Sequence, residues 1–221
     1  MRRHEVVSPV QRTNPDNQVK TMMRIVVLSC TLVVVLALIA NRYSPTTVLP
    51  RENNPEEPPE HGIRRFWEGD TPGGRLFFLQ ETEGRDGPAC VQMVLAYWKY
   101  YPDQHELKVE MRTQDNGTSP EFMDDPFKDR GLTVESGGRV NQFSGAASRL
   151  REEIDRNRPA IISIRMSEKD RFYYMVVVGY YDEGIIVNDP TREDGEHLRL
   201  DYGELNRIWS YNRFWMLIAY S

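Results

Sequence analysis

The residues best suited to chemistry lie where a turn leads into a helix, in the stretch GRDGPACVQMVLAYW, residues 84–98. Gly87 and Pro88 form the turn, and Asp86 precedes them. A helix dipole stabilises a thiolate or an oxyanion at the helix N-terminus, so enzymes often place a nucleophile there. Asp86 has two interpretations, which the sequence leaves open. It caps the helix, which contributes about 1 kcal/mol, or its carboxylate contacts a ligand in a cleft.

Cys90 is the only thiol near this turn, and it lies one helical turn beyond Asp86. It shares an apolar helix face with Val94 and Tyr97. We expect a buried structural thiol, because such a position has neither exposure nor a base partner. The alternative is a thiol peptidase in which Cys90 is the nucleophile.

A second carboxylate, Asp189, stands in the motif Asn-Asp-Pro at residues 188–190. Two carboxylates that flank a cleft can catalyse hydrolysis as acid and base, so a hydrolase that uses Asp86 and Asp189 is another alternative. Neither a metal nor a cofactor is expected, because no cluster of His or carboxylates completes a set of ligands. The net charge of −5 argues against a nucleic-acid partner.

The elements that must position these residues are helices first and a largely antiparallel sheet afterwards, which is an α+β fold. Hydrophobic spacing and turn signals predict the following segments. They are a short strand or extended lead-in at 75–80, helices at 88–100, from Ser119 and Pro120, and at 144–158, a strand at 160–166, a hairpin at 171–190 that turns at 182–184, a short strand after Gly195, a helix around 202–209 and a closing strand at 213–220.

The N-terminal part of the chain has a different character. Residues 25–40 carry no charge, and the flanking residues extend this run to a transmembrane anchor at 25–43. Basic residues outnumber acidic ones in the tail at 1–24, which predicts a cytoplasmic N-terminus and an extracytoplasmic C-terminal domain. A cleaved signal peptide and a buried core helix are the alternatives.

A Pro-rich, acidic segment, residues 44–74, follows the predicted anchor. Such a composition cannot bury a core, so we expect a linker that runs extended in solvent. Phe66 and Trp67 are the exception, since they offer apolar side chains that can dock on the edge of a domain. The folded domain is then expected at 75–221.

Several short motifs of this domain follow one another in a fixed order. Gln80 stands six residues before Asp86, and Gly87-Pro88-Ala89 and an amphipathic helix come next. The sequence RPAIISI leads into a strand, Tyr173 stands six residues before Gly179, and Asn188-Asp189-Pro190 follows the next strand. In this order and spacing, residues 75–221 resemble the C39-like peptidase family, which has a papain-like fold.

The resemblance implies a role for each position of the catalytic site. Gln80 matches the residue that supports the oxyanion, Asp86 the nucleophile, Tyr173 the catalytic His, and Asp189 the residue that orients the His. The family's chemistry needs a thiolate paired with an imidazole, and here neither is in place. None of the four histidines, which are His4, His61, His105 and His197, lies near Tyr173 in the sequence.

We therefore expect a membrane-anchored C39-like domain that is catalytically inactive and binds a peptide or protein partner in the former cleft. In such a site the hydroxyl of Tyr173 is expected to bond Asp86 or Asp189 and to turn the catalytic pair into a fixed polar bridge.

Overall fold

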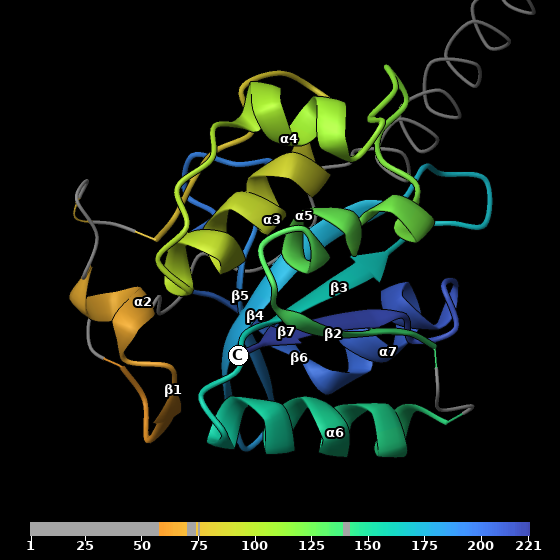
Figure 1. Ribbon diagram of the computed structural model, residues 1–221. Helices are drawn as coiled ribbons and strands as arrows, with labels where there is room; N and C mark the ends of the chain where they lie inside the picture. The colour runs from red at the N-terminus through yellow and green to blue at the C-terminus, as the bar shows by residue number, and fades with distance from the viewer. Residues whose placement is uncertain (1–57, 70–73, 75, 139–141) are drawn as a thin grey trace, which may run out of the picture. The chain divides into compact units, whose positions relative to one another are not determined.

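The part of the chain that the structure describes is residues 58–69, 74, 76–138 and 142–221 of the computed structural model (Figure 1). The expected tail at 1–24 and the expected anchor at 25–43 lie outside these residues. Within them, no helix is long and apolar enough to cross a membrane.

A seven-stranded sheet forms the centre of the described domain, and every pairing in it is antiparallel. Six strands lie in the order β2-β7-β3-β4-β5-β6, and β1 pairs with β4 beyond the end of β3. The strands are β1 (His61–Gly62), β2 (Thr133–Gly137), β3 (Ala160–Ile164), β4 (Tyr173–Tyr181), β5 (Gly184–Asn188), β6 (Leu198–Asp201) and β7 (Met216–Tyr220). The expected combination of helices with an antiparallel sheet is confirmed.

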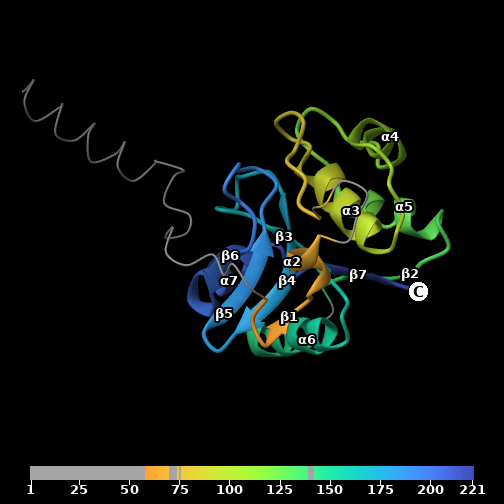
Figure 2. The same ribbon diagram turned by 90° about the vertical axis from the view of Figure 1, so that its left-hand side faces the viewer.

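Helices pack on the sheet from opposite sides, which explains why its central strands β3 and β5 are buried along their whole length. Every residue of β3 and β5 is buried, so both faces of these strands must be covered. Figures 1 and 2 show α3 (Asp86–Tyr97), α4 (Gln104–Glu110) and α5 (Asp125–Lys128) together on one side, and α6 (Phe143–Asp155) on the other. Helix α7 (Tyr202–Ser210) contacts β3, β5 and β6.

Helix α3 is the central helix of the domain and carries the residues of chemical interest. It is buried around nearly its whole circumference, from Asp86 to Tyr97, and packs against β4 and α4. The sequence indicated an amphipathic helix with one apolar face, and the structure instead covers nearly every side of it, because β3, β4 and α4 all pack against it. The predicted helix at 88–100 is present, although it begins at Asp86 and ends at Tyr97.

Residues 58–69 form a short packed segment, which we name the N-terminal strap. Its strand β1 pairs with β4, and its helix α2 (Arg65–Glu68) follows immediately. Ile63 and Phe66 are 1% and 2% exposed, and the ring of Phe66 stacks on Tyr97 of α3. The docking expected of Phe66 is confirmed. The expectation of an extended, solvated segment is wrong for the rest of the strap, because Ile63 is buried and β1 pairs with β4.

Other differences from the expected elements are local. Helix α4, helix α5 and strand β2 were not expected, and residues 76–80 form no strand. Ser119 and Pro120 begin a single 3-10 turn, Pro120–Phe122, without a side-chain cap. The remaining expected elements are present as α6, α7 and the strands β3 to β7.

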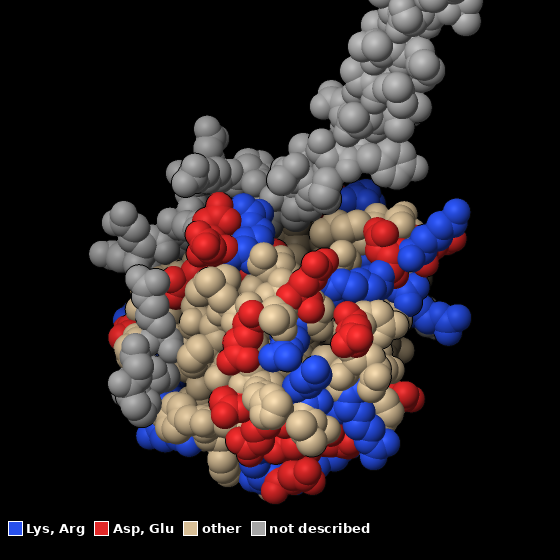
Figure 3. All heavy atoms as spheres, turned by 90° about the horizontal axis from the view of Figure 1, so that it is seen from above, with Lys and Arg blue, Asp and Glu red and all other residues tan. Residues whose placement is uncertain are grey.

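One face of the domain carries both signs of charge. Figure 3 looks down on the side that carries α4, and acidic and basic side chains lie among one another there. On this face the described residues form no extended basic patch of the kind that binds a phosphate backbone.

Candidate functional site

Asp86 lies at the N-terminus of α3 with its carboxylate turned toward β4. The side chain is 1% exposed. Its Oδ1 accepts a hydrogen bond of 2.7 Å from Nη1 of Arg171, and its Oδ2 accepts one of 2.8 Å from the backbone N–H of Tyr174. Arg85, not Asp86, is the N-cap residue, and no side chain caps the helix. The carboxylate therefore joins two distant elements, and the expectation that it caps its own helix is wrong.

Some groups around Asp86 raise the pKa of its carboxyl, and others lower it. Burial raises the pKa of the carboxyl above its ordinary value, and the hydrogen bond and charge of Arg171 and the Tyr174 amide lower it. The net direction is upward. Arg171 is therefore the group that allows a carboxylate to persist at this depth, since an unpaired buried charge is very costly.

Tyr173 begins β4 and is half-buried. Its ring lies against Arg171, with 4.0 Å between the guanidinium carbon and the ring centroid. Asp86 is thus bridged to β4 by Arg171 and the Tyr174 amide rather than by the Tyr173 hydroxyl. The correspondence of Tyr173 with the family's catalytic His stays a prediction, as do the roles assigned to Gln80, Asp86 and Asp189.

Gln80 is joined to the residue that follows Asp189, although the two lie far apart in the sequence. The backbone N–H of Gln80 donates to the carbonyl of Pro190 at 2.9 Å. The Oδ1 of Asp189 accepts from the N–H and the hydroxyl of Thr191, at 2.9 and 2.7 Å. Burial raises the pKa of Asp189, and the negative charge of Asp86 raises it further. The two carboxylates therefore repel each other electrostatically, but each accepts hydrogen bonds from its own partners.

Cys90 lies beneath this site and is fully buried, as expected. Burial raises the pKa of its thiol well above the ordinary value, and the charges of Asp86 and Asp189 raise it further. A reactive cysteine needs the opposite conditions, which are exposure and a nearby positive charge. The geometry therefore disfavours Cys90 as a nucleophile.

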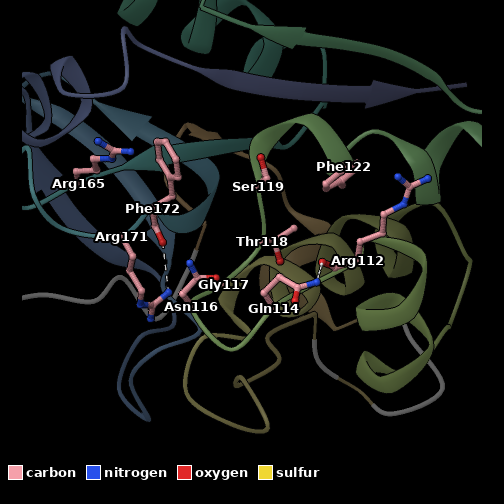
Figure 4. A pocket seen from close by; sticks show the side chains of 10 residues that line it. All are labelled: Arg112, Gln114, Asn116, Gly117, Thr118, Ser119, Phe122, Arg165, Arg171 and Phe172. Carbon is pink, nitrogen blue, oxygen red and sulfur yellow. Dashed lines mark hydrogen bonds between the residues drawn. The ribbon is translucent and has the colours of Figure 1, made fainter.

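A pocket of about 530 Å³ opens beside Arg171 (Figure 4). One wall comes from residues 112–122, which follow α4, and the other from Arg165, Arg171 and Phe172, which flank the connection between β3 and β4. Gly87 lets the first wall approach α3, because a Cβ there would lie 2.7 Å from the hydroxyl of Thr118. The pocket thus lies between the segment that follows α4 and the connection between β3 and β4.

Sequence reasoning missed the residues that tie the site together, chiefly Arg171 and Tyr174. Tyr174 is 1% exposed, and its hydroxyl donates to the carbonyl of Thr118 at 2.7 Å. A signal for Arg171 did exist, since a buried Asp86 requires a cation. Nothing in the sequence says which of the many arginines supplies it. Among the described residues, no group of three or more His, Cys, Asp or Glu side chains could hold a metal ion.

Comparisons with known proteins agree on one kind of domain. The family model described as "Peptidase_C39 like family" matches residues 80–215. The peptidase domain of Streptococcus ComA, a bi-functional ABC transporter, is similar over 65% of this chain and 96% of its own, with 18% identity and a TM-score of 0.53. A comparison with curated proteins finds no match.

Two further solved structures are similar to the chain. A double glycine motif protease from an AMS/PCAT transporter, in complex with the leader peptide, covers 65% of this chain and 89% of its own, with 18% identity and a TM-score of 0.51. A C39-like peptidase from Bacillus anthracis covers 69% and 96%, with 12% identity and a TM-score of 0.52. At these identities the structural matches show that the fold is shared.

Proposed function

The chain belongs to the Peptidase_C39 like family, and on that premise we propose that it is a membrane-anchored member that binds a peptide or protein partner without cutting it. The partner lies in the cleft where the helical side of the domain meets the sheet. The proposal has three parts, which are the loss of cleavage, the retention of binding and the anchor.

The state of Asp86 is the observation that supports a loss of cleavage. Asp86 is the first residue of α3, where the family resemblance puts the nucleophile. Both of its oxygens are engaged, by Arg171 and by the Tyr174 amide, so the carboxylate is not free to attack a peptide bond. The only described thiol, Cys90, is buried below it.

Two observations support the retention of binding. The pocket beside Arg171 has the size of an ordinary ligand site, about 530 Å³. One of the proteins with a similar fold is described in complex with its leader peptide, so a domain of this architecture can hold a peptide.

The test is to incubate the full chain with a random peptide library and to identify bound and free peptides by mass spectrometry. We expect a bound fraction and no new peptide termini. New termini that disappear in Cys90→Ala would establish a thiol peptidase instead. New termini that persist in Cys90→Ala but disappear in Asp86→Asn or Asp189→Asn would establish the carboxylate hydrolase. No bound fraction would contradict the proposal.

The anchor rests on the uncharged run within residues 25–43 and on the excess of basic residues before it. Protease added to intact cells or spheroplasts is expected to remove the domain that follows residue 44. The same protease should leave a cytoplasmic control protein uncut until the membrane is dissolved. Full protection of the domain, with an exported control protein digested, would contradict an extracytoplasmic location.

A further inference from the structure

The pocket beside Arg171 carries three arginines and no acidic side chain. Arg112, Arg165 and Arg171 all belong to its lining, together with the rings of Phe122 and Phe172. Figure 4 shows Arg165 and Phe172 on one side and Arg112 and Phe122 on the other, with Thr118 and Ser119 between them. This lining differs from the mixed charges of the face in Figure 3.

Two of the three arginines have no carboxylate partner within the part of the chain that the structure describes. Arg171 is neutralised by Asp86 at 2.7 Å. The polar contact of the Arg165 guanidinium is a bond of 3.3 Å to the carbonyl of Glu168, and its Nε is buried without a hydrogen-bond partner. Arg112 is exposed and forms no ion pair among the described residues. The pocket therefore holds two positive charges that a ligand can neutralise.

Each arginine of the pocket rests on an aromatic ring, which orients its guanidinium. The guanidinium carbon lies 4.8 Å from the ring centroid of Phe122 for Arg112, and 3.8 Å from that of Phe172 for Arg165. Stacking of this kind limits the rotamers of a long side chain, so less entropy is lost when a ligand binds. A planar guanidinium in a defined orientation matches the two oxygens of a carboxylate.

We propose that this pocket binds an extended acidic peptide, whose Asp or Glu side chains pair with Arg112 and Arg165. The proposal rests on the function proposed above and names the chemistry of the partner. Because the two arginines lie on opposite walls in Figure 4, a chain with carboxylates along its length meets both, whereas a single small anion meets one. The rings of Phe122 and Phe172 offer apolar surface to the peptide between its charges.

The experiment selects binders from a random displayed-peptide library on the full chain in detergent micelles, without assuming a sequence. The most enriched peptide is then synthesised with a fluorophore, beside a version in which every Asp and Glu is replaced by Asn and Gln. Binding is measured by fluorescence anisotropy to the unaltered chain, Arg112→Gln, Arg165→Gln and the double variant. Arg64→Gln is the matched control, because Arg64 is exposed and lies outside the pocket.

We expect acidic peptides to be enriched and the dissociation constant to rise about tenfold in each single variant and about a hundredfold in the double variant, because each change removes one charge-assisted hydrogen-bond pair. The Asn/Gln peptide should bind at least tenfold more weakly, and Arg64→Gln should not change the affinity. Binding should also weaken as salt is added.

Enrichment of peptides without acidic residues would overturn this inference and leave the proposed binding function in place. Enrichment of acidic peptides whose affinity does not change in the Arg112 and Arg165 variants would also overturn it, because the site would then lie elsewhere. If no peptide is enriched, the inference fails, and so does the proposed binding of a peptide in this domain.

Discussion

Replacing Arg171 with methionine is expected to lower the free energy of unfolding by about 3 kcal/mol near neutral pH, because it leaves the charge of Asp86 buried and unpaired. Asp86 is 1% exposed, and its Oδ1 loses its partner at 2.7 Å. The measurement is urea denaturation followed by tryptophan fluorescence. Arg207→Met is the control, because Arg207 pairs with Glu204 at the surface and an exposed pair contributes less than about 1 kcal/mol.

The dependence of this loss on pH has a defined sign. The pKa of Asp86 is already above its ordinary value in the folded chain, and Arg171 is one of the groups that lower it. Without Arg171 the folded pKa rises further, so the folded state of Arg171→Met holds its proton up to a higher pH. A group with a raised folded pKa contributes stability at low pH that disappears as the pH rises through that pKa. The loss in Arg171→Met is therefore expected to be smallest at about pH 4 and to grow toward pH 8.

A second variant separates the charge from the packing. Asp86→Asn combined with Arg171→Met leaves no buried charge, so at neutral pH the double variant is expected to be more stable than Arg171→Met alone. Equal or lower stability of the double variant would contradict the ion pair as the reason for the loss. So would a loss in Arg171→Met that does not change with pH.

Replacing Phe66 with alanine is expected to lower the free energy of unfolding by about 3 kcal/mol, the cost of deleting a large buried side chain. Phe66 is 2% exposed and stacks on Tyr97 with 5.7 Å between the ring centroids. This loss would show that the N-terminal strap is part of the folded domain and not a spacer. Urea denaturation measures it.

Tyr101→Ala is the matched control for this change, because Tyr101 is an aromatic residue that is 51% exposed. A change of well under 1 kcal/mol is expected there. If Phe66→Ala is as mild as Tyr101→Ala, the strap contributes nothing to stability and the segment behaves as the linker that its composition indicates.

The composition of the strap misled sequence reasoning for a physical reason. The prolines and acidic residues around it are typical of a solvated linker, so only the aromatic side chains were expected to dock, and the burial of Ile63 and the pairing of β1 were missed. The burial of Ile63 and Phe66 depends on a surface formed by β4 and α3, which lie far along the chain. A window of sequence cannot contain that surface.

Local sequence determined the elements that depend on local forces. The apolar run of α3, the turn between β4 and β5, and Pro159 after α6 each act through neighbouring residues, and these elements formed within about three residues of their predicted bounds. The order of short motifs from Gln80 to Pro190 was also sufficient to indicate the family, which the match over residues 80–215 bears out.

Only the tertiary structure decided what Asp86 does. Its partners Arg171 and Tyr174 lie 85 and 88 residues away, and no periodicity or turn signal connects positions so far apart. The same holds for the pocket, whose arginines come from separate parts of the chain and meet only when the helices pack on the sheet. Side-chain propensities act over a few residues. The pairing of a buried charge depends on the whole fold instead, because an arginine at many different sequence positions could have supplied the partner of Asp86.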